Sequence, residues 1–224
     1  MNLNKKLSDI LDPNKIEVVK NPIEKAHGLP NECYLNDDYL EFEKEKIFKN
    51  NWTMIGVASS VPNPGDAKPF NLLGIPILIV RNKDNEVKVF HNVCSHRGFK
   101  LVDQECKLKN VIRCPYHSWS YDFNGKLTVT PHIGGLGKHE VEGFDKNKSN
   151  LKEIKSNIWM DLIFININSN AKSFEDFIKP LEDRWSKFIS KKDQKLIRHS
   201  SDNGYFNMTV NSNWKFAIEN YCES

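Results

Sequence analysis

Short apolar runs separated by turn signals dominate the chain between residues 52 and 93. Strands are predicted at 52–57, 75–80 and 87–93, where apolar residues alternate with polar ones or form a continuous buried run. Pro62-Asn-Pro-Gly65 and Asn82-Lys-Asp-Asn85 supply turn signals around them. Strands and turns at this spacing indicate an antiparallel β domain.

The same pattern resumes after residue 110. Short strands are predicted at 111–113 and 119–123, and the Asn124-Gly125 dipeptide favours a type I′ hairpin turn that returns the chain into a partner strand. A long segment rich in Gly, Lys and Asn predicts a surface loop. The partner strand, the loop and the last two strands are expected at 127–130, 133–150, 157–160 and 162–167.

Helical spacing appears outside the β region. Asp38 and Glu41 resemble a capping box, and Ser173 can cap a second helix that Pro180 should break or kink. A third apolar face repeats at helical spacing near the end of the chain. The three helices are predicted over 38–49, 173–189 and 213–223.

These patterns divide the chain into three parts. Residues 1–49 form an arm and a helix, with 1–35 polar, interrupted by prolines and expected to be extended. The β domain is expected over 50–167. Residues 168–224 begin a further domain, in which 191–195 is predicted to be a solvated link.

Composition narrows the function classes. The chain has 224 residues, with 39% hydrophobic and 11% aromatic content, which suits a folded globular protein. A net charge of +3 without a block of like charges gives nucleic-acid binding no support. The sequence shows neither a secretory signal nor an apolar run long enough for a membrane span. Five cysteines without framework spacing favour reduced thiols, so a cytoplasmic location is expected.

Two short segments each offer one thiolate and one imidazole, in Cys94-Ser-His96-Arg-Gly and Cys114-Pro-Tyr-His117-Ser-Trp. A mixed set of two cysteines and two histidines is the ligand set of a Rieske [2Fe–2S] centre. In that interpretation, Cys94 and Cys114 hold one iron, and His96 and His117 hold the other. The four ligands would lie on loops at the tips of hairpins, held by a rigid sheet.

Two other interpretations of these four residues remain open. Tetrahedral zinc is one, although zinc sites usually combine Cys-x₂₋₄-Cys with His-x₃₋₅-His pairs. Unrelated core residues are the other, which the dense spacing disfavours. His91 and His132 lie close to the two segments, and for both a hydrogen-bonded structural role is favoured over metal ligation.

At these residues the sequence resembles the Rieske non-haem iron oxygenases of the ring-hydroxylating type, whose large (α) subunits carry Cys-x-His-Arg-Gly and Cys-x-Tyr-His-x-Trp. Respiratory Rieske proteins have an extra cysteine in each loop, whereas the corresponding neighbourhood of this chain holds Phe99 and Trp119. The resemblance implies an α+β fold: an antiparallel, iron–sulfur-protein-like β domain followed by the start of an α+β catalytic domain. It also implies a low-potential cluster with Arg97, Gly98, Tyr116 and Trp119 around it.

The end of the chain carries a second part of this resemblance. Asn213-Trp-Lys, Glu219-Asn and Glu223 match the family in order and approximate spacing, although spacing alone would place both glutamates on a solvated helix face. In the family, the carboxylate at the Glu223 position bridges a cluster histidine of one subunit and an iron histidine of its neighbour, and the same role is open to Glu223. The ligands of the family's mononuclear Fe(II) would follow residue 224 and are expected only in a full-length subunit.

The resemblance therefore implies the electron-transfer portion of an oxygenase that hydroxylates a small organic substrate, aromatic or quaternary amine, with O₂. A reductase, a ferredoxin or both would supply electrons, and the full-length subunit would form a homotrimer or hetero-oligomer. One rival is a Rieske ferredoxin, which would resemble residues 50–165 alone and which the helices after 172 disfavour. The other rival is a zinc-stapled binding module.

Overall fold

The computed structural model describes residues 6–200 and 208–223. These residues form two compact units. One comprises residues 50–200, and the other combines 6–49 with 208–223. The helix α4, which follows the predicted β domain, belongs to the same unit as the strands.

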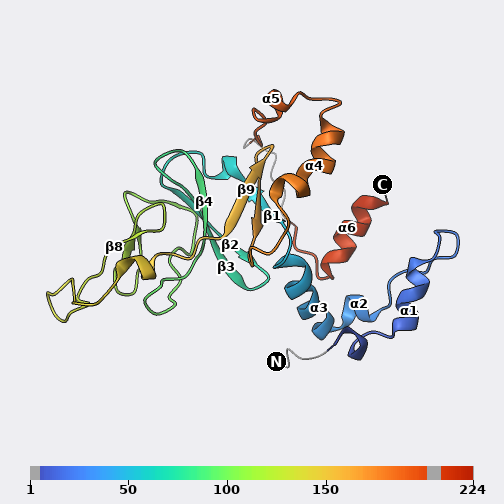
Figure 1. Cartoon of the computed structure of the whole chain (residues 1–224), viewed down its shortest axis with the longest axis horizontal. Helices are drawn as coiled ribbons and strands as arrows, with labels where there is room; N and C mark the ends of the chain where they lie inside the picture. Colours follow the sequence, from blue (N-terminus) through green and yellow to red (C-terminus); the bar gives the residue numbers. More distant parts are fainter. Residues whose placement is uncertain (1–5, 201–207, 224) are drawn as a thin grey trace. The chain divides into compact units, whose positions relative to one another are not determined.

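The larger unit is built on three antiparallel sheets (Figure 1). The first has the order β1-β10-β9, formed by Thr53–Val57, Leu162–Asn166 and Lys155–Trp159. The register of β1 shifts between Met54 and Gly56, which marks a β-bulge. The first and last predicted strands of the β domain are confirmed, and they pair with one another.

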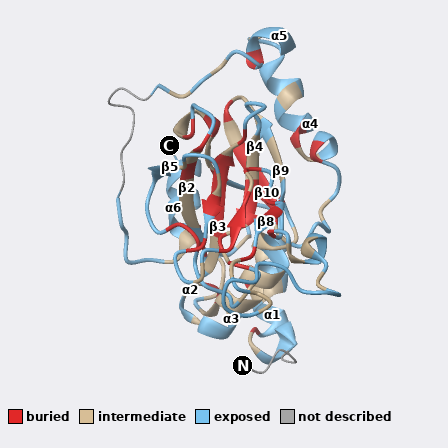
Figure 2. Cartoon of the chain, turned by 90° about the vertical axis from the view of Figure 1, so that its left-hand side faces the viewer, coloured by how far each residue is buried: buried red, intermediate tan, exposed pale blue. Residues whose placement is uncertain are grey.

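The second sheet has the order β4-β3-β2-β5, formed by Val87–His91, Ile75–Arg81, Asp66–Leu72 and Cys106–Lys107. Strand β3 lies inside it, and Ile77, Leu78 and Val80 are fully buried, which explains the continuous apolar run in the sequence. Figure 2 shows this buried centre in red.

Strand β2 is missing from the sequence-based prediction. Lys68, Pro69 and Asn71 interrupt its apolar pattern, although Ala67 and Leu72 are buried. Its pairing with β3 over six residue pairs makes it a full strand. Tertiary pairing therefore decides this segment against its weak local preference.

The third sheet has the order β6-β7-β8, formed by Ile112–Arg113, Ser120–Tyr121 and Leu127–Val129. The predicted type I′ turn is wrong, because that turn needs positive φ at both central residues and only Gly125 has it (φ +82°). Instead, Gly125 N–H donates to Asp122 O at 3.0 Å, and the Asp122 carboxylate accepts from the backbone N–H of Asn124 and Lys126. The register shift between Ser120 and Tyr121 completes a bulged hairpin.

Helices α4 (Phe174–Trp185) and α5 (Lys191–Gln194) follow the strands and lie away from β8 (Figure 1). The predicted cap is confirmed, because Ser173 Oγ accepts from Asp176 N–H at 3.1 Å. Pro180 lies inside α4 without breaking it. The predicted solvated link at 191–195 is wrong in part, since α5 occupies most of it. Two 3₁₀ turns complete the unit, η4 (Ala58–Ser60) and η5 (Lys146–Ser149), the second inside the predicted surface loop.

The smaller unit is helical. The prediction of an extended arm over 1–35 is wrong for its described part, and residues 1–5 lie outside the description. The sequence held a missed signal, because Asp12 caps a helix that begins with Pro13. The elements are η1 (Leu7–Asp9), α1 (Pro13–Glu17), η2 (Val18–Lys20), α2 (Glu32–Leu35), α3 (Asp37–Glu43), the π-helical turn η3 (Lys44–Phe48) and α6 (Trp214–Cys222).

The helices predicted at 38–49 and 213–223 are confirmed as α3 with η3 and as α6. The cap of α3 is Asn36, whose side chain accepts from Tyr39 N–H, and not Asp38. The mixed α+β class with antiparallel sheets is confirmed. Within the described ranges, no helix combines the length and apolarity that crossing a bilayer requires.

Candidate metal centre

The first candidate loop follows β4 and is closed by its own backbone. Cys94 N–H donates to Phe99 O at 2.8 Å, and Gly98 N–H donates to Cys94 O at 2.9 Å. Gly98 has φ +71°, a conformation that glycine adopts without the strain of a side chain. The turn therefore favours the glycine of the Cys-x-His-Arg-Gly motif.

The second loop repeats this hydrogen-bond scheme. Cys114 N–H donates to Trp119 O at 2.8 Å, and Ser118 N–H donates to Cys114 O at 3.0 Å. Ser118 occupies the position of the first loop's glycine and also has a positive φ, +58°. Two segments with different sequences thus form the same turn, each beginning at a cysteine.

The cluster site is defined as Cys94, His96, Cys114 and His117, and the exposure of its side chains increases from the cysteines to the histidines. Both cysteines are 2% exposed, whereas both imidazoles are half-buried. The two histidine rings meet edge to face, with centroids 4.9 Å apart. The two thiols are neighbours in the core. The structure therefore presents a pair of thiols and a pair of imidazoles.

Burial sets the protonation state of the side chains at the cluster site. Burial raises the pKa of the Cys94 thiol, the neighbouring Cys114 adds to this rise, and the Tyr121 hydroxyl opposes it. The pKa of His96 is lowered by burial and by the nearby His117 and Arg97. A neutral imidazole keeps the lone pair that a metal requires.

One atom of the candidate ligands is unsatisfied. His117 Nδ1 is buried and lacks a hydrogen-bond partner among the described residues. Such a group costs free energy unless something binds it. Within 6–200 and 208–223, no three His, Cys, Asp or Glu side chains converge as they would around a single ion. The two pairs instead suit a cluster of two irons, in which each iron takes two protein ligands.

The other predicted residues surround this site. Trp119 is 5% exposed, and its ring stacks on His96 at 4.6 Å with an interplanar angle of 10°. Tyr116 packs against the His117 ring with centroids 3.8 Å apart, yet remains 56% exposed. Arg97 and Gly98 are exposed beside them.

Two residues next to the ligands were not singled out from the sequence. Tyr121 is fully buried, and its hydroxyl lies 3.2 Å from Cys94 Sγ. Ser95 N–H donates to the same hydroxyl at 3.1 Å, and Ser95 Oγ lies 2.8 Å from it. Burial and the hydrogen bond to Cys94 raise the pKa of Tyr121, so it remains a neutral phenol. The available signal was its place two residues after Trp119, on the same face of the strand predicted at 119–123.

The two neighbouring histidines belong to β4 and to the loop after β8. His91 ends β4, and its Nε2 is buried without a partner among the described residues. His132 lies in the loop after β8, where its Nδ1 accepts from Gly137 N–H at 2.8 Å. The hydrogen-bonded role expected of these histidines is therefore visible at His132.

In the smaller unit, α6 does not have the polarity expected from its sequence. Lys215 is buried and binds Glu43 at 2.8 Å, and Glu219 accepts from Tyr34 O–H at 2.6 Å. The hydrogen bond to Glu219 raises the pKa of Tyr34 to about 12. The interpretation of Glu219 as a solvated surface charge is wrong, whereas Glu223 is exposed at the end of α6.

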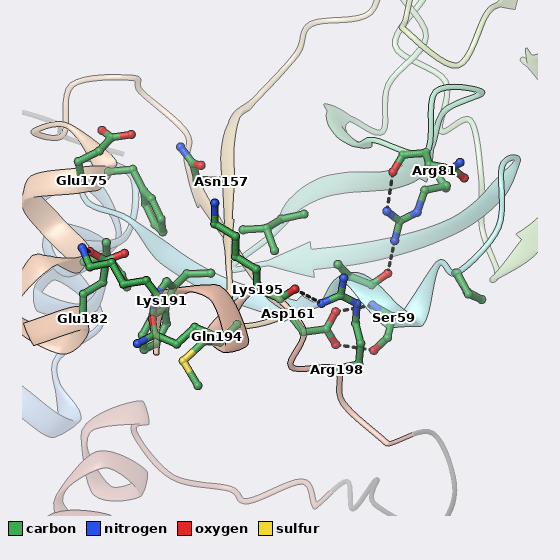
Figure 3. Close-up of a pocket in the computed structure, with 18 residues that line it drawn as sticks. Ser59, Arg81, Asn157, Asp161, Glu175, Glu182, Lys191, Gln194, Lys195 and Arg198 are labelled. Carbon is green, nitrogen blue, oxygen red and sulfur yellow. Dashed lines mark hydrogen bonds and ion pairs between the residues drawn. The ribbon is translucent and has the colours of Figure 1, made fainter. Parts of the chain in front are cut away.

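A cleft of about 1000 Å³ lies between the β9–β10 hairpin and helices α4 and α5 (Figure 3). Two of its charged residues hold its walls together. Arg81 donates to three backbone carbonyls at 2.7–2.8 Å. Asp161 accepts from Ser59 Oγ at 2.6 Å and from His199 N–H at 2.8 Å. None of the residues that the sequence nominated for a site lines this cleft.

Comparison with known proteins bears on the larger unit first. Residues 51–141 match the family model of the Rieske [2Fe–2S] domain. The match contains both loops of the cluster site and all three sheets except β9 and β10.

Relatives extend the likeness beyond that domain. The carnitine monooxygenase oxygenase subunit of Acinetobacter pittii is 33% identical over 199 residues, covering 88% of this chain and 51% of the relative. The 2-aminobenzenesulfonate 2,3-dioxygenase subunit alpha of an Alcaligenes species is 27% identical over 194 residues, covering 86% and 47%. The chain thus spans about half the length of the curated relatives it matches.

A solved structure supports the same relationship. The quaternary ammonium Rieske monooxygenase CntA in complex with its substrate L-carnitine matches with a TM-score of 0.74 at 31% identity. The match covers 88% of this chain and 53% of that structure.

Proposed function

Because the chain belongs to the Rieske oxygenase family, we propose that it provides the electron-transfer portion of an oxygenase that hydroxylates a small organic molecule with O₂. The observation that carries this proposal is the cluster site itself, with two buried thiols and two half-exposed imidazoles on matching loops. The matched Rieske domain and the oxygenase relatives support it.

The residues present fit a [2Fe–2S] cluster. In this proposal Cys94 and Cys114 hold one iron, and His96 and His117 hold the other. The unsatisfied Nδ1 of His117 supports the assignment, because a bound metal would satisfy this atom. When bound, such a cluster accepts and releases one electron at a time.

The surrounding residues then have separable tasks. The buried cysteines anchor the site in the core, and Trp119 fixes the plane of the His96 ring by stacking on it. The half-exposed imidazoles, with Arg97, Gly98 and Tyr116 beside them, form the side on which a redox partner comes near enough for electron exchange. A reductase or ferredoxin is the partner that this chemistry requires.

The ligand assignment is tested by substitution and spectroscopy of the purified chain. Cys94→Ser and Cys114→Ser should abolish the EPR signal of the reduced Rieske centre, whereas Cys106→Ser, at an exposed cysteine, should retain it. His96→Cys or His117→Cys, where a cluster still assembles, should lower the reduction potential, because a thiolate adds negative charge.

A retained Rieske signal in either Cys→Ser ligand variant would refute the thiolate assignment. An unchanged or raised potential after the histidine substitutions would refute the imidazole assignment. A colourless chain that contains zinc without iron or sulfide would replace the redox function with a zinc-stapled binding module. A Rieske ferredoxin remains the alternative if the protein transfers electrons but consumes no O₂ with any substrate.

For the substrate, we propose a quaternary ammonium compound in preference to an aromatic one. The carnitine monooxygenase subunit is more similar to this chain than the aminobenzenesulfonate dioxygenase subunit, at 33% against 27% identity over comparable lengths. In the test, the protein as it occurs in the cell is incubated separately with carnitine, glycine betaine and an aromatic sulfonate, and O₂ consumption is measured. Substrate-dependent O₂ consumption with the aromatic compound alone would reverse this preference.

Glu223 is the residue that we propose to link subunits. Its exposed position at the end of α6 leaves its carboxylate accessible to a neighbouring chain, as a bridge within a homotrimer or hetero-oligomer requires. Glu223→Gln should slow substrate-coupled reoxidation of the cluster and leave its potential unchanged. We also propose a cytoplasmic location, supported by the three cysteines outside the cluster site, Cys33, Cys106 and Cys222, none of which forms a disulfide.

A further inference from the structure

The hydroxyl of Tyr121 has more neighbours than it has hydrogens. It lies 3.2 Å from Cys94 Sγ and 2.8 Å from Ser95 Oγ, and it accepts the Ser95 backbone N–H at 3.1 Å. Ser95 Oγ also donates to Ser149 O at 2.6 Å. Ser95, which lies between Cys94 and His96 in the sequence, therefore links the Tyr121 hydroxyl to the backbone of Ser149 at the end of η5.

The direction of each hydrogen bond follows from what each group can do. A carbonyl oxygen only accepts, so Ser95 uses its one hydroxyl hydrogen on Ser149 O. Toward Tyr121, Ser95 Oγ can then only accept. An iron-bound cysteine sulfur also has no hydrogen to donate. The single phenol hydrogen of Tyr121 is therefore shared between two acceptors, Ser95 Oγ and Cys94 Sγ.

We infer that Ser95 is a positioning residue that lowers the reduction potential of the cluster by competing with Cys94 Sγ for the phenol hydrogen of Tyr121. The inference rests on the proposed function, since it requires the cluster to be bound at Cys94. Ser149 O is essential to it, because it fixes the Ser95 hydroxyl as an acceptor toward Tyr121. The distances favour the oxygen, as 2.8 Å is the usual length of an O–H···O bond.

Two opposite effects follow. Hydrogen bonds to the cluster sulfurs stabilise the more negative, reduced form and raise the potential. Tyr121→Phe removes the donor, so the potential should fall. Ser95→Ala removes the competing acceptor and leaves Cys94 Sγ as the only partner for the phenol hydrogen, so the potential should rise. A serine that only supports the loop or polarises the phenol would give a fall in both variants.

The experiment measures the reduction potential by spectroscopic titration for wild type, Ser95→Ala, Tyr121→Phe and the double variant. We expect an upward shift, a downward shift, and a double variant equal to Tyr121→Phe. Ser95→Thr keeps the hydroxyl and should retain the wild-type potential. If Ser95→Ala loses the cluster, the isosteric pair Ser95→Thr and Ser95→Val repeats the comparison, and Val should have the higher potential.

A fall or no change on removing the serine hydroxyl would overturn the inference. An upward shift that persists when Ser95→Ala is added to Tyr121→Phe would overturn it too, because the effect would not pass through the phenol. The proposed function fails separately: a wild-type chain without a Rieske EPR signal refutes the cluster, whereas a normal signal with unshifted variants refutes only the role of Ser95.

Discussion

The buried ion pair in the smaller unit allows a quantitative test. Glu43 and Lys215 have side chains only 3% and 9% exposed, and the ammonium donates to both carboxylate oxygens, at 2.8 and 2.9 Å. Trp214 Nε1 donates to the same carboxylate at 3.1 Å. The ammonium also lies 5.1–5.4 Å from the ring centroids of Tyr34, Tyr39 and Trp214. The pair therefore joins α6 to α3 inside an aromatic enclosure.

Removing one partner should cost far more than the pair itself contributes. Lys215→Met leaves the Glu43 carboxylate buried, with the Trp214 indole as a remaining donor, and breaking a buried pair in this way costs about 3–5 kcal/mol. Adding Glu43→Gln removes the uncompensated charge and keeps an acceptor for Trp214. The double variant should then lose less than about half of what Lys215→Met loses.

Urea unfolding of the whole chain measures these losses in the free energy of unfolding. Hydrogen exchange at the α6 amides measures them locally. Lys191→Met is the matched control, because Lys191 forms an ion pair with Glu182 that is accessible to solvent. Such a pair contributes at most about 1 kcal/mol to stability. The reasoning is refuted if Lys215→Met costs no more than this control. It is also refuted if the stability loss of the double variant equals the sum of the losses of Lys215→Met and Glu43→Gln measured separately. The two side chains would then be energetically independent.

Three further predictions concern the larger unit. Trp119→Ala should cost about 3–5 kcal/mol of stability and also shift the cluster potential, because its ring stacks on a ligand imidazole; loss of stability with an unmoved potential would mean packing alone. Burial lowers the pKa of His91, so its contribution to stability is intact above pH 6.5 and lost as pH falls below it; His91→Gln should flatten this part of the unfolding profile measured from pH 7 downward. Gly125→Ala should cost more than the roughly 1–2 kcal/mol of its left-handed backbone, because a Cβ there would lie 2.6 Å from Phe90. In thermal unfolding, Gly137→Ala should show the backbone cost alone, since nothing lies within 4 Å of its Cβ; equal losses would exclude the clash.

What the sequence could predict was local. Strands β1, β3 and β10 have apolar runs that stand out in a window of a few residues, and the cap of α4 lies three residues from its partner. Strand β2 could not be found in this way, because its evidence is its pairing with β3 and not its own composition. The hairpin after β7 was located correctly but given the wrong turn type.

Residues joined across long sequence distances were beyond the same reasoning. Lys215 reads as a polar position on a helix, and only its partner 172 residues away explains why it is buried. Tyr121 likewise looks like an ordinary strand residue until the hairpin brings its hydroxyl to Cys94, 27 residues earlier. A buried polar group needs a partner, but the sequence does not say which one.

The cluster site combines both kinds of information. Its cysteines and histidines could be proposed from the sequence because ligand chemistry favours such residues at short spacing, and Gly98 because its turn has a positive φ. The sequence did not predict that the second loop has the same backbone conformation as the first, because Ser118 takes the place of a glycine there. The shared turn closes each loop through its cysteine backbone, and both cysteines are buried while both histidines stay half-exposed. The proposed redox centre would need this asymmetry, with an anchor in the core and an edge open to a partner, and two unlike sequences reach it by one hydrogen-bond scheme.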